Sequence, residues 1–486
     1  MAGVSDSLNT LGLDVSGSSR RSFLDMPSTP SRRVLGSTGT TSGLYGSGSL
    51  YSSSSVSAEE KVVLDIGTYT LRAGFSGDAQ PLHKEELFGS FGAARDTYLQ
   101  RAIGQQHGLL SMAPNDDADT RQDVLERVLV EHVRHVYRDH LLVDAKTKKV
   151  AIVESPLLPA PVKRALARVL LGNLRVPQLS FYPAPVLALM TCGRSTGLVV
   201  DCGHRATTVT PVYDSRLLAS YMTTTPLAGN SVHQAVRALV SRFAIVESAP
   251  GRPAVALSEL LQSNNADTTV LDDSLVRHIV TKLLYASPLT PPPHVLAGSF
   301  DDCHLAADSF GSKLINWFQT NSSATSDGAI TRISLTTAEH GRIVLAVPSW
   351  IRERAVEALL AGDKTTDHMG IVDTLVACIA KTPMDTRREL VASILVTGGV
   401  ADMPNFSTRL LQDLKLRLES TPRWAALAKD AALADRSGTG ANSSLFAASN
   451  RPWIGASLAV AAKIGGVDIR RDEFDDSPSS LLSRLD

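Results

Sequence analysis

Residues 61–78 read KVVLDIGTYTLRAGFSGD and decide the fold of this 486-residue chain. An apolar run around Asp65 breaks at Gly67 and resumes at Ala73, which is the pattern of a β-hairpin with a turn of small residues. Such a turn can aim backbone N–H groups and the Thr68 hydroxyl at an anion, and Gly67 permits close approach because it has no Cβ. The motif is not specific by itself, since DxGT also occurs in ordinary hairpins.

The charged side chains of this hairpin suit a nucleotide with a divalent cation. Asp65 at the strand end can hold the water shell of Mg²⁺ rather than the phosphate itself, because two bare anions repel each other. Arg72 can supply a countercharge to the phosphate. With Gly67, Thr68 and Tyr69 of the turn, these residues form the first part of the predicted nucleotide site.

A second hairpin follows at residues 197–213, GLVVDCGHRATTVTPVY. It has the same order of an apolar strand, Asp201, a turn with Gly203, and a second strand rich in Thr and Val. The chain therefore contains the hairpin twice. Asp201 and Gly203 join the predicted nucleotide site, and Asp201 is the second predicted Mg²⁺ position, again through water.

A third element lies at residues 394–406, ILVTGGVADMPNF. Gly398 and Gly399 separate a predicted strand from a helix predicted at 407–418. A diglycine between strand and helix is a usual place for a phosphate or a ribose to lie against the backbone. Both glycines therefore belong to the predicted nucleotide site.

In this order the three elements resemble the phosphate- and nucleoside-facing parts of the actin and Hsp70 ATPase fold. Over about residues 61–474 the chain is similar to actin-related proteins. Five stretches carry this similarity: VVLDIGTYTLRAGFSGDAQP from Val62, ESPLLP from Glu154, GRSTGLVVDCGH from Gly193, TGG at Thr397 and RPWIGASLAV from Arg451. The resemblance implies an α/β protein of the actin/Hsp70-like ATPase fold, with two lobes, each built on a mixed five-stranded sheet, and a nucleotide cleft between them. It also implies ATP or ADP with Mg²⁺ as the cofactor.

The predicted organisation follows from composition and from this resemblance. Residues 1–57 are rich in Ser, Thr and Gly and too poor in apolar residues to build a core, so we expect them to be disordered. The remaining boundaries are a first lobe at 58–210 with a shortened outer subdomain at 82–120, a second lobe at 211–475 with inserts near 247–267, 287–327 and 422–450, and a polar C-terminal tail at 476–486. We expect the inserts to be surface decorations rather than parts of the active site.

Several positions depart from the family pattern. In actin a glutamine orients the attacking water. The matching position in this chain is Ala184. His204 and Arg205 match an aspartate and a glycine of the second phosphate hairpin, and Val280 and Thr281 match a lysine and a glutamate that contact the nucleoside. Losing the group that orients water costs about 10² to 10⁴ in rate, and each lost charged contact about 1.5 to 3 kcal/mol in binding.

The resemblance therefore implies a degraded ATPase site and a protein that is not an enzyme. An alternative is that Arg72, with Arg205, holds a permanently bound nucleotide as a structural element. A further alternative, an ATPase that forms filaments as actin does, is disfavoured by Ala184 and His204. An Hsp70-like chaperone would need a substrate-binding domain after the ATPase lobes.

Composition excludes several classes of function. The 48 basic and 49 acidic residues leave a net charge of −1, which gives no reason to expect nucleic acid or an anionic membrane as a partner. The four cysteines lack CxxC spacing, which favours reduced thiols in an intracellular protein. No run of 18 apolar residues occurs, so we expect no membrane insertion.

Three histidines lie on an amphipathic helix predicted at 121–142. His132 and His135 have the i, i+3 spacing of a metal-binding pair, and His140 follows them. No cluster of Cys or carboxylates accompanies them in the sequence. We therefore expect solvated or capping histidines rather than metal ligands.

Within the family, the chain most resembles the divergent pointed-end actin-related subunit of the dynactin complex. This implies a non-polymerising, capping subunit in the cytoplasm and cytoskeleton that binds the end of an actin-related filament and other dynactin subunits. Such a subunit would cap the filament by shape alone, because a changed face ends a filament without any chemistry. As part of dynactin it would support dynein-driven, microtubule-based transport. The alternative is an actin-related subunit of a nuclear chromatin-remodelling complex.

Overall fold

The computed structural model describes ten stretches of the chain: residues 60–86, 118–247, 255–259, 271–288, 290–292, 313–322, 330–337, 341–362, 367–435 and 446–476. The predicted N-terminal tail, most of the interval 82–120 and the C-terminal tail beyond residue 476 lie outside the described residues. The predictions made for those segments are therefore not tested here.

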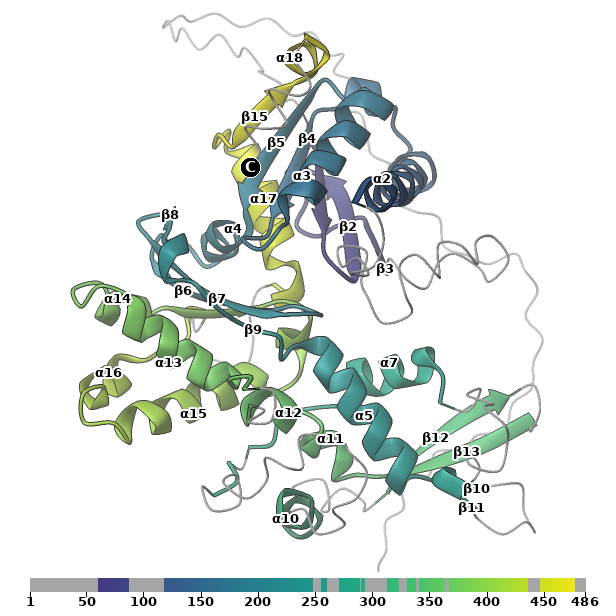
Figure 1. Cartoon of the computed structure of the whole chain (residues 1–486), viewed down its shortest axis with the longest axis vertical. Coiled ribbons are helices and arrows are strands. Elements are labelled where there is room, and N and C mark those ends of the chain that lie inside the picture. The colour runs from purple at the N-terminus through teal and green to yellow at the C-terminus, as the bar shows by residue number, and fades with distance from the viewer. Residues whose placement is uncertain are drawn as a thin grey trace, which may run out of the picture. The chain divides into compact units, whose positions relative to one another are not determined.

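Six strands form the first sheet, in the order β15 (Val467–Arg470), β5 (Gln178–Pro183), β4 (Val150–Glu154), β1 (Val62–Ile66), β2 (Thr70–Phe75) and β3 (His83–Glu86). Strands β1 and β2 are antiparallel, which confirms the first predicted hairpin, while β1, β4 and β5 run parallel. The sheet has one strand more than the expected five, because β15 near the C-terminus pairs with β5 (Figure 1). Strand β3 falls in the interval where no strand pattern was recognised.

Helices cover both faces of this sheet. They are α2 (Ala118–His135), the π-helix η1 (Val136–Leu141), the short η2 (Ala145–Thr147), α3 (Ala160–Ala167), the π-helix η3 (Arg168–Asn173), α4 (Ala184–Met190), α17 (Arg451–Ala461) and α18 (Arg471–Asp476). Val62 and Leu64 of β1 pack into a hydrophobic cluster with Leu129 of α2. Val63 between them packs into another cluster with Trp453 of α17. Because successive strand side chains point to opposite faces, one apolar run serves both clusters.

Helix α17 lies close to α4 and to β1. Trp453 is fully buried, and its Nε1 donates a hydrogen bond to the Val63 carbonyl at 3.0 Å. A Cβ at Gly455 would come within 2.0 Å of the Leu187 carbonyl oxygen, so only glycine permits this helix contact. In Figure 1 the yellow α17 and β15 accordingly lie among the blue elements of the first lobe.

The second lobe contains two sheets. One joins β14 (Ile394–Thr397), β6 (Gly197–Cys202), β7 (Thr207–Tyr213) and β8 (Arg216–Leu217), with β9 (Thr223–Thr225) also paired to β7, which gives the expected five strands. Strands β6 and β7 form the second predicted hairpin. The other sheet has the order β11 (Val255–Ala256), β10 (Ile245–Glu247), β13 (Gly341–Pro348) and β12 (Ile330–Thr337).

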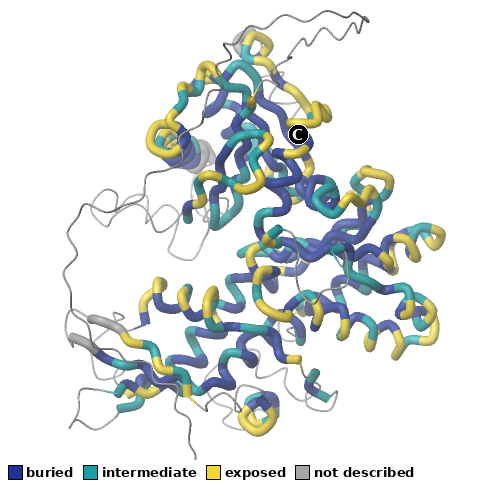
Figure 2. The backbone as a smooth tube through the Cα atoms, turned by 180° about the vertical axis from the view of Figure 1, so that it is seen from behind, coloured by how far each residue is buried: buried dark blue, intermediate teal, exposed yellow. Residues whose placement is uncertain are grey.

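One large hydrophobic cluster joins most of this lobe. The described helices of the second lobe are η4 (Ala219–Tyr221), α5 (Gly229–Phe243), α7 (Asp273–Lys282), α10 (Lys313–Asn321), α11 (Ile351–Arg354), α12 (Glu357–Leu360), α13 (Ile371–Lys381), α14 (Arg387–Val391), η6 (Gly399–Asp402), α15 (Phe406–Glu419), α16 (Ala425–Asp430) and η7 (Ala448–Asn450). Figure 2 shows the helices with buried and exposed residues alternating along them, as amphipathic helices require.

All three predicted inserts are less peripheral than expected. Leu257, within the predicted insert 247–267, is fully buried in the core of the second lobe. Leu314 and Phe318 of α10, within the predicted insert 287–327, are fully buried in the core of the second lobe. Trp424 and Ala428, within the predicted insert 422–450, are buried in the same core. Apolar side chains at helical spacing anchor the latter two segments, so their described parts are not surface decorations.

The lobe boundary at residue 210 is also corrected. Strand β6 pairs in parallel with β14, almost 200 residues later, so the second lobe begins before the β6–β7 hairpin. The segment 451–476 returns to the first lobe through α17 and β15. Strand pairing, rather than chain order, assigns a segment to a lobe.

The thiols and helices agree with the composition in two respects. Among the described residues Cys192, Cys202 and Cys378 are free thiols. Within the same part of the chain, no helix combines the length and the hydropathy that a membrane span requires.

Candidate functional site: two hairpin turns and the residues between them

The turns of the two DxG hairpins are built alike. The Gly67 N–H donates to the Thr70 carbonyl at 2.9 Å, and the Gly203 N–H donates to the Ala206 carbonyl at 3.2 Å. Each glycine amide is therefore used inside its own turn. Thr68 is half-buried in the first turn.

Asp65 and Arg72, both predicted site residues, bind each other. Their carboxylate and guanidinium lie 2.9 Å apart, and Arg72 also donates from Nε to the Asn450 side-chain oxygen at 3.1 Å. Burial raises the pKa of Asp65, and the charge and hydrogen bond of Arg72 oppose this rise. The predicted countercharge for a phosphate is thus paired with the predicted Mg²⁺ carboxylate. Asn450, which closes the predicted insert 422–450, was missed because only the fold brings it here.

Asp201 lies against the backbone of the diglycine. Strand pairing sets Asp201 beside Thr397, and Gly398 follows with a φ of 93°. A Cβ on Gly398 would come within 2.6 Å of the Asp201 Oδ1, so glycine is needed there for both conformation and space. At Gly399, by contrast, a Cβ would meet nothing within 4 Å. Gly399 begins the 3₁₀ turn η6, and α15 starts only at residue 406.

The two predicted Mg²⁺ carboxylates are near enough to interact. Burial raises the pKa of Asp201 to about 6, and the negative charge of Asp65 contributes to that rise. Two carboxylates that disfavour each other's ionised form are typical of a site that can take a cation. The structure therefore brings together the predicted residues of all three elements.

Aromatic rings join the two turns. Tyr69 of the first turn stacks on His204 of the second, with ring centroids 4.3 Å apart and planes at 23°. His233 of α5 meets His204 edge to face at 5.5 Å and Tyr69 at 6.2 Å. Offset stacks and edge-to-face pairs are the favourable aromatic geometries.

Arg277 of α7 completes this group. Its Nε donates to the Tyr69 hydroxyl at 2.6 Å, and its Nη1 forms an ion pair with Glu86 of β3 at 2.6 Å. We call Tyr69, Glu86, His204, His233 and Arg277 the inter-sheet cluster. Two of its members come from the first sheet and three from the second lobe, so it ties the lobes together.

Burial determines the protonation of the two cluster histidines. Burial, followed by the neighbouring His233, Arg205 and Arg277, lowers the pKa of His204 to about 4. Burial and then Arg277 lower the pKa of His233 to about 4. Both rings are therefore neutral at pH 7, as packing against a guanidinium requires.

The sequence comparison with actin singled out Val280 and Thr281, which lie close to Arg277 on α7. The Thr281 hydroxyl donates a hydrogen bond to the Arg277 carbonyl one turn earlier, and Val280 packs against the core. Neither side chain points to a nucleoside contact. Arg277 lies one helical turn before the singled-out position, which is the signal that could have found it.

Ala184 has no polar role. It is the first residue of α4 and is buried in the cluster that contains Val153 and Trp453. The alanine methyl group packs where a glutamine would need a polar partner.

Several groups of the predicted nucleotide site already have partners within the chain. The Tyr69–His204 stack joins the turns directly, the amides of Gly67 and Gly203 are used, and Arg72 is paired with Asp65. Of the predicted site groups, the Gly67 and Gly203 amides and the Arg72 guanidinium therefore already have partners in the chain.

Comparisons with known proteins agree with the fold. The family model described as Actin matches residues 56–270 and 335–484, the greater part of the chain. The chain is 24% identical to Actin-related protein 4 of Arabidopsis thaliana over 366 residues, which is 73% of this chain and 76% of that protein.

Proposed function

The chain belongs to the actin family, and we propose that it is a non-polymerising actin-related protein that works by shape, as a capping subunit of a cytoskeletal assembly. The best candidate assembly is the pointed-end complex of dynactin, in the cytoplasm. The observation that carries the proposal is the inter-sheet cluster, in which Tyr69 and His204 join the turns that would otherwise face a phosphate.

The proposed absence of turnover is supported by three features of the cleft residues. Ala184 offers no group to orient water, and His204 stands where the family pattern has a carboxylate. Arg277 holds Tyr69 in place through a hydrogen bond of 2.6 Å. Losing one water-orienting group costs about 10² to 10⁴ in rate.

Capping needs only a stable shape. An actin-related subunit that accepts a neighbour on one face and presents a changed opposite face ends a filament, because a heterologous interface cannot then propagate. Lobes held together by the inter-sheet cluster would keep that face constant whatever the nucleotide level. Partners are then the filament end and neighbouring subunits, with dynein bound only indirectly.

An actin-related subunit of a nuclear chromatin-remodelling complex is the second candidate. The similarity to Actin-related protein 4 of Arabidopsis thaliana is compatible with this candidate. A chain without turnover would serve in both, because neither role requires hydrolysis by this subunit.

Phosphate release by the purified full-length chain tests the first half of the proposal. We expect no release above the rate of the Asp65→Asn and Asp201→Asn variants, and no sedimentable filaments. Rapid release that either substitution abolishes would overturn the proposal in favour of a working ATPase.

Identification of the stoichiometric companions of the chain, purified from cells, tests the second half. Dynactin and dynein subunits are the expected companions. Recovery of a Snf2-type motor instead would replace the cytoskeletal assembly by the nuclear one.

A further inference from the structure

Five polar side chains converge where β3 meets α2 and η1, away from the inter-sheet cluster. They are His83 and Glu85 of β3, His132 and His135 of α2, and His140 of η1, and we call them the histidine cluster. One ligand atom each from His83, Glu85 and His140 lies within 4.8 Å of the other two. No cluster of Cys or carboxylates accompanies these histidines in the sequence, but β3 supplies one carboxylate, Glu85, from a distant stretch.

Two contacts in the histidine cluster have the spacing of metal ligands. His83 Nε2 lies 3.2 Å from Glu85 Oε2, and His140 Nε2 lies 3.3 Å from His135 Nε2. A tetrahedral site with bonds of about 2.0–2.1 Å places its donor atoms about 3.3 Å apart. The His83–Glu85 pair therefore already matches one edge of such a tetrahedron, and His140 supplies the third donor atom of the group.

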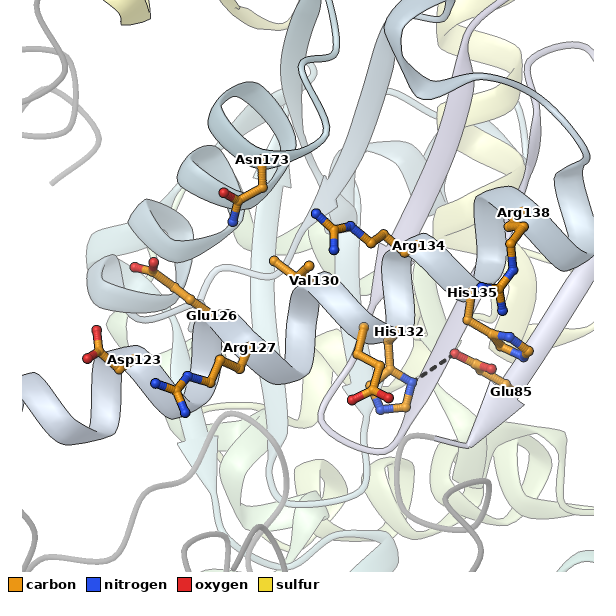
Figure 3. Close-up of a pocket in the computed structure, with 11 residues that line it drawn as sticks. Glu85, Asp123, Glu126, Arg127, Val130, His132, Arg134, His135, Arg138 and Asn173 are labelled. Carbon is orange, nitrogen blue, oxygen red and sulfur yellow. Dashed lines mark hydrogen bonds and ion pairs between the residues drawn. The ribbon is translucent and has the colours of Figure 1, made fainter. Parts of the chain in front are cut away.

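The side chains behind these donors hold them in place. His132 is buried, and its Nδ1 contacts Glu85 Oε1 at 3.1 Å, which leaves Oε2 facing His83. Figure 3 shows His132 and His135 projecting from α2 toward Glu85. The His135 Nδ1 contacts Asp139 at 2.6 Å, so its Nε2 is available toward His140. A carboxylate on the second ring nitrogen is the usual support of a metal-binding histidine.

The π-helix brings His140 into the group. In a continuous α-helix a residue five positions after His135 would be turned away by about 140°. The i→i+5 bonding of η1 returns His140 toward the same face, and its ring stacks on His83 at 3.5 Å. An amphipathic pattern alone does not reveal this change of period.

We propose that the histidine cluster binds a divalent transition-metal ion, with Zn²⁺ as the best match. His83, Glu85 and His140 are the ligands, His135 contacts His140 beside them, and His132 is a positioning residue for Glu85. Imidazole nitrogens with one carboxylate suit Zn²⁺ and its late first-row neighbours, whereas Mg²⁺ and Ca²⁺ require oxygen ligands.

The site is reached from a surface cavity. A cavity of about 860 Å³ runs along α2, and its lining includes Glu85, His132 and His135 (Figure 3). His140 is exposed and His83 is half-buried, so the ion can enter without unfolding the lobe. A metal here would cross-link β3 to α2 and η1, elements that are otherwise joined by side-chain contacts.

Calorimetric titration of the full-length chain, carrying no histidine tag, with ZnCl₂ tests the proposal. We expect one ion per chain, and a loss of affinity of roughly 100-fold or more in the His83→Ala, His140→Ala double variant. Glu85→Gln, which keeps the shape but removes the charge, should weaken binding by roughly 10-fold or more. His278→Ala, at an exposed helical histidine outside the histidine cluster, is the matched control and should bind as wild type does.

Co²⁺ binding provides a readout that does not depend on stability. The wild-type chain should give the strong visible absorption of four-coordinate Co²⁺, and added Zn²⁺ should remove it. Equal Zn²⁺ affinity in the wild-type chain and the double variant, or a Co²⁺ spectrum that the double variant retains, would overturn the proposal.

Discussion

The inter-sheet cluster and the histidine cluster are built from the same kinds of residue and have opposite properties. In the inter-sheet cluster, His204 and His233 lie half-buried against the Tyr69 ring and the Arg277 guanidinium. In the histidine cluster, ring nitrogens meet a carboxylate and one another at 3.1 to 3.3 Å. Both groups stack rings, but only in the histidine cluster do ring nitrogens also face a carboxylate.

The comparison shows that a histidine acquires its role from what its nitrogens face. An arginine as a neighbour disfavours a bound cation and lowers the histidine pKa, whereas a carboxylate neighbour attracts a cation. We therefore expect the inter-sheet cluster to stabilise the protein without any ligand, and the histidine cluster to stabilise it only with a metal. Four experiments test this contrast.

The largest expected effect is metal-dependent stability. At Zn²⁺ 100-fold above its dissociation constant, the free energy of unfolding should rise by about 2.7 kcal/mol, if the unfolded chain does not bind the ion. Urea unfolding with Zn²⁺ or with a chelator measures this. The His83→Ala, His140→Ala double variant should gain nothing, and an equal gain in that variant would remove the contrast between the two clusters.

The next largest effect is expected for Arg277→Ala, which should lower the free energy of unfolding by about 2 kcal/mol. The substitution removes both the hydrogen bond to Tyr69 and the ion pair with Glu86. Arg237→Ala on α5 is the control, because its ion pair with Asp273 is largely exposed and should contribute little. Urea unfolding without metal compares them, and equal losses would show that the inter-sheet contact does not hold the lobes.

Acidification should distinguish the buried histidines from ordinary ones. The pKa of His204 is about 4 in the folded chain, against 6.5 for an unperturbed histidine. Between these values the unfolded chain binds the extra proton, so stability present above pH 6.5 is lost as pH falls toward 4. Asp201 has the opposite effect on the free energy of unfolding. Its pKa is raised from 3.8 to about 6 in the folded chain, so below pH 6 the folded chain binds the extra proton and gains stability as the pH falls.

The variant His204→Gln isolates the histidine contribution. Its free energy of unfolding should fall less steeply than that of the wild-type chain, by up to about 1 kcal/mol per pH unit between pH 6 and pH 5. Urea unfolding at each pH measures the two slopes. Identical slopes would mean that His204 is protonated in the folded chain.

The smallest effect is expected for a single histidine in the absence of metal. His204→Ala should lower the free energy of unfolding by about 1 kcal/mol, because it removes the stack on Tyr69. His135→Ala should cause no measurable change in the presence of a chelator, because its side chain is largely solvated. A clear loss in His135→Ala would show that the histidine cluster is structural without a metal.

Much of the fold could be predicted from local pattern. The two DxG hairpins and the strand before Gly398 were found at their observed positions, because each is a short apolar run next to a turn residue. Strand β3, with the sequence HKEE, was missed because it is polar throughout and only Glu85 is buried. Its strand conformation comes from pairing with β2.

The candidate site was predictable in part. Asp65, Asp201 and Gly398 come together as predicted, since each lies at a strand end that the hairpins define. Arg277 was not predicted, because it is 208 residues away from Tyr69. Its place one helical turn before Thr281 is the only local signal for it. Asn450 was missed for the same reason, at 378 residues from Arg72.

The sequence by itself determined the actin-like fold, the positions of the turns and the absence of a polar side chain at Ala184, since these depend on local apolar periodicity and residue type. Tertiary structure decided which side chains fill the space between the turns and which histidines share a carboxylate. Those contacts join residues from different lobes or from separate strands and helices, so their geometry exists only after strand pairing and helix packing have placed the backbone.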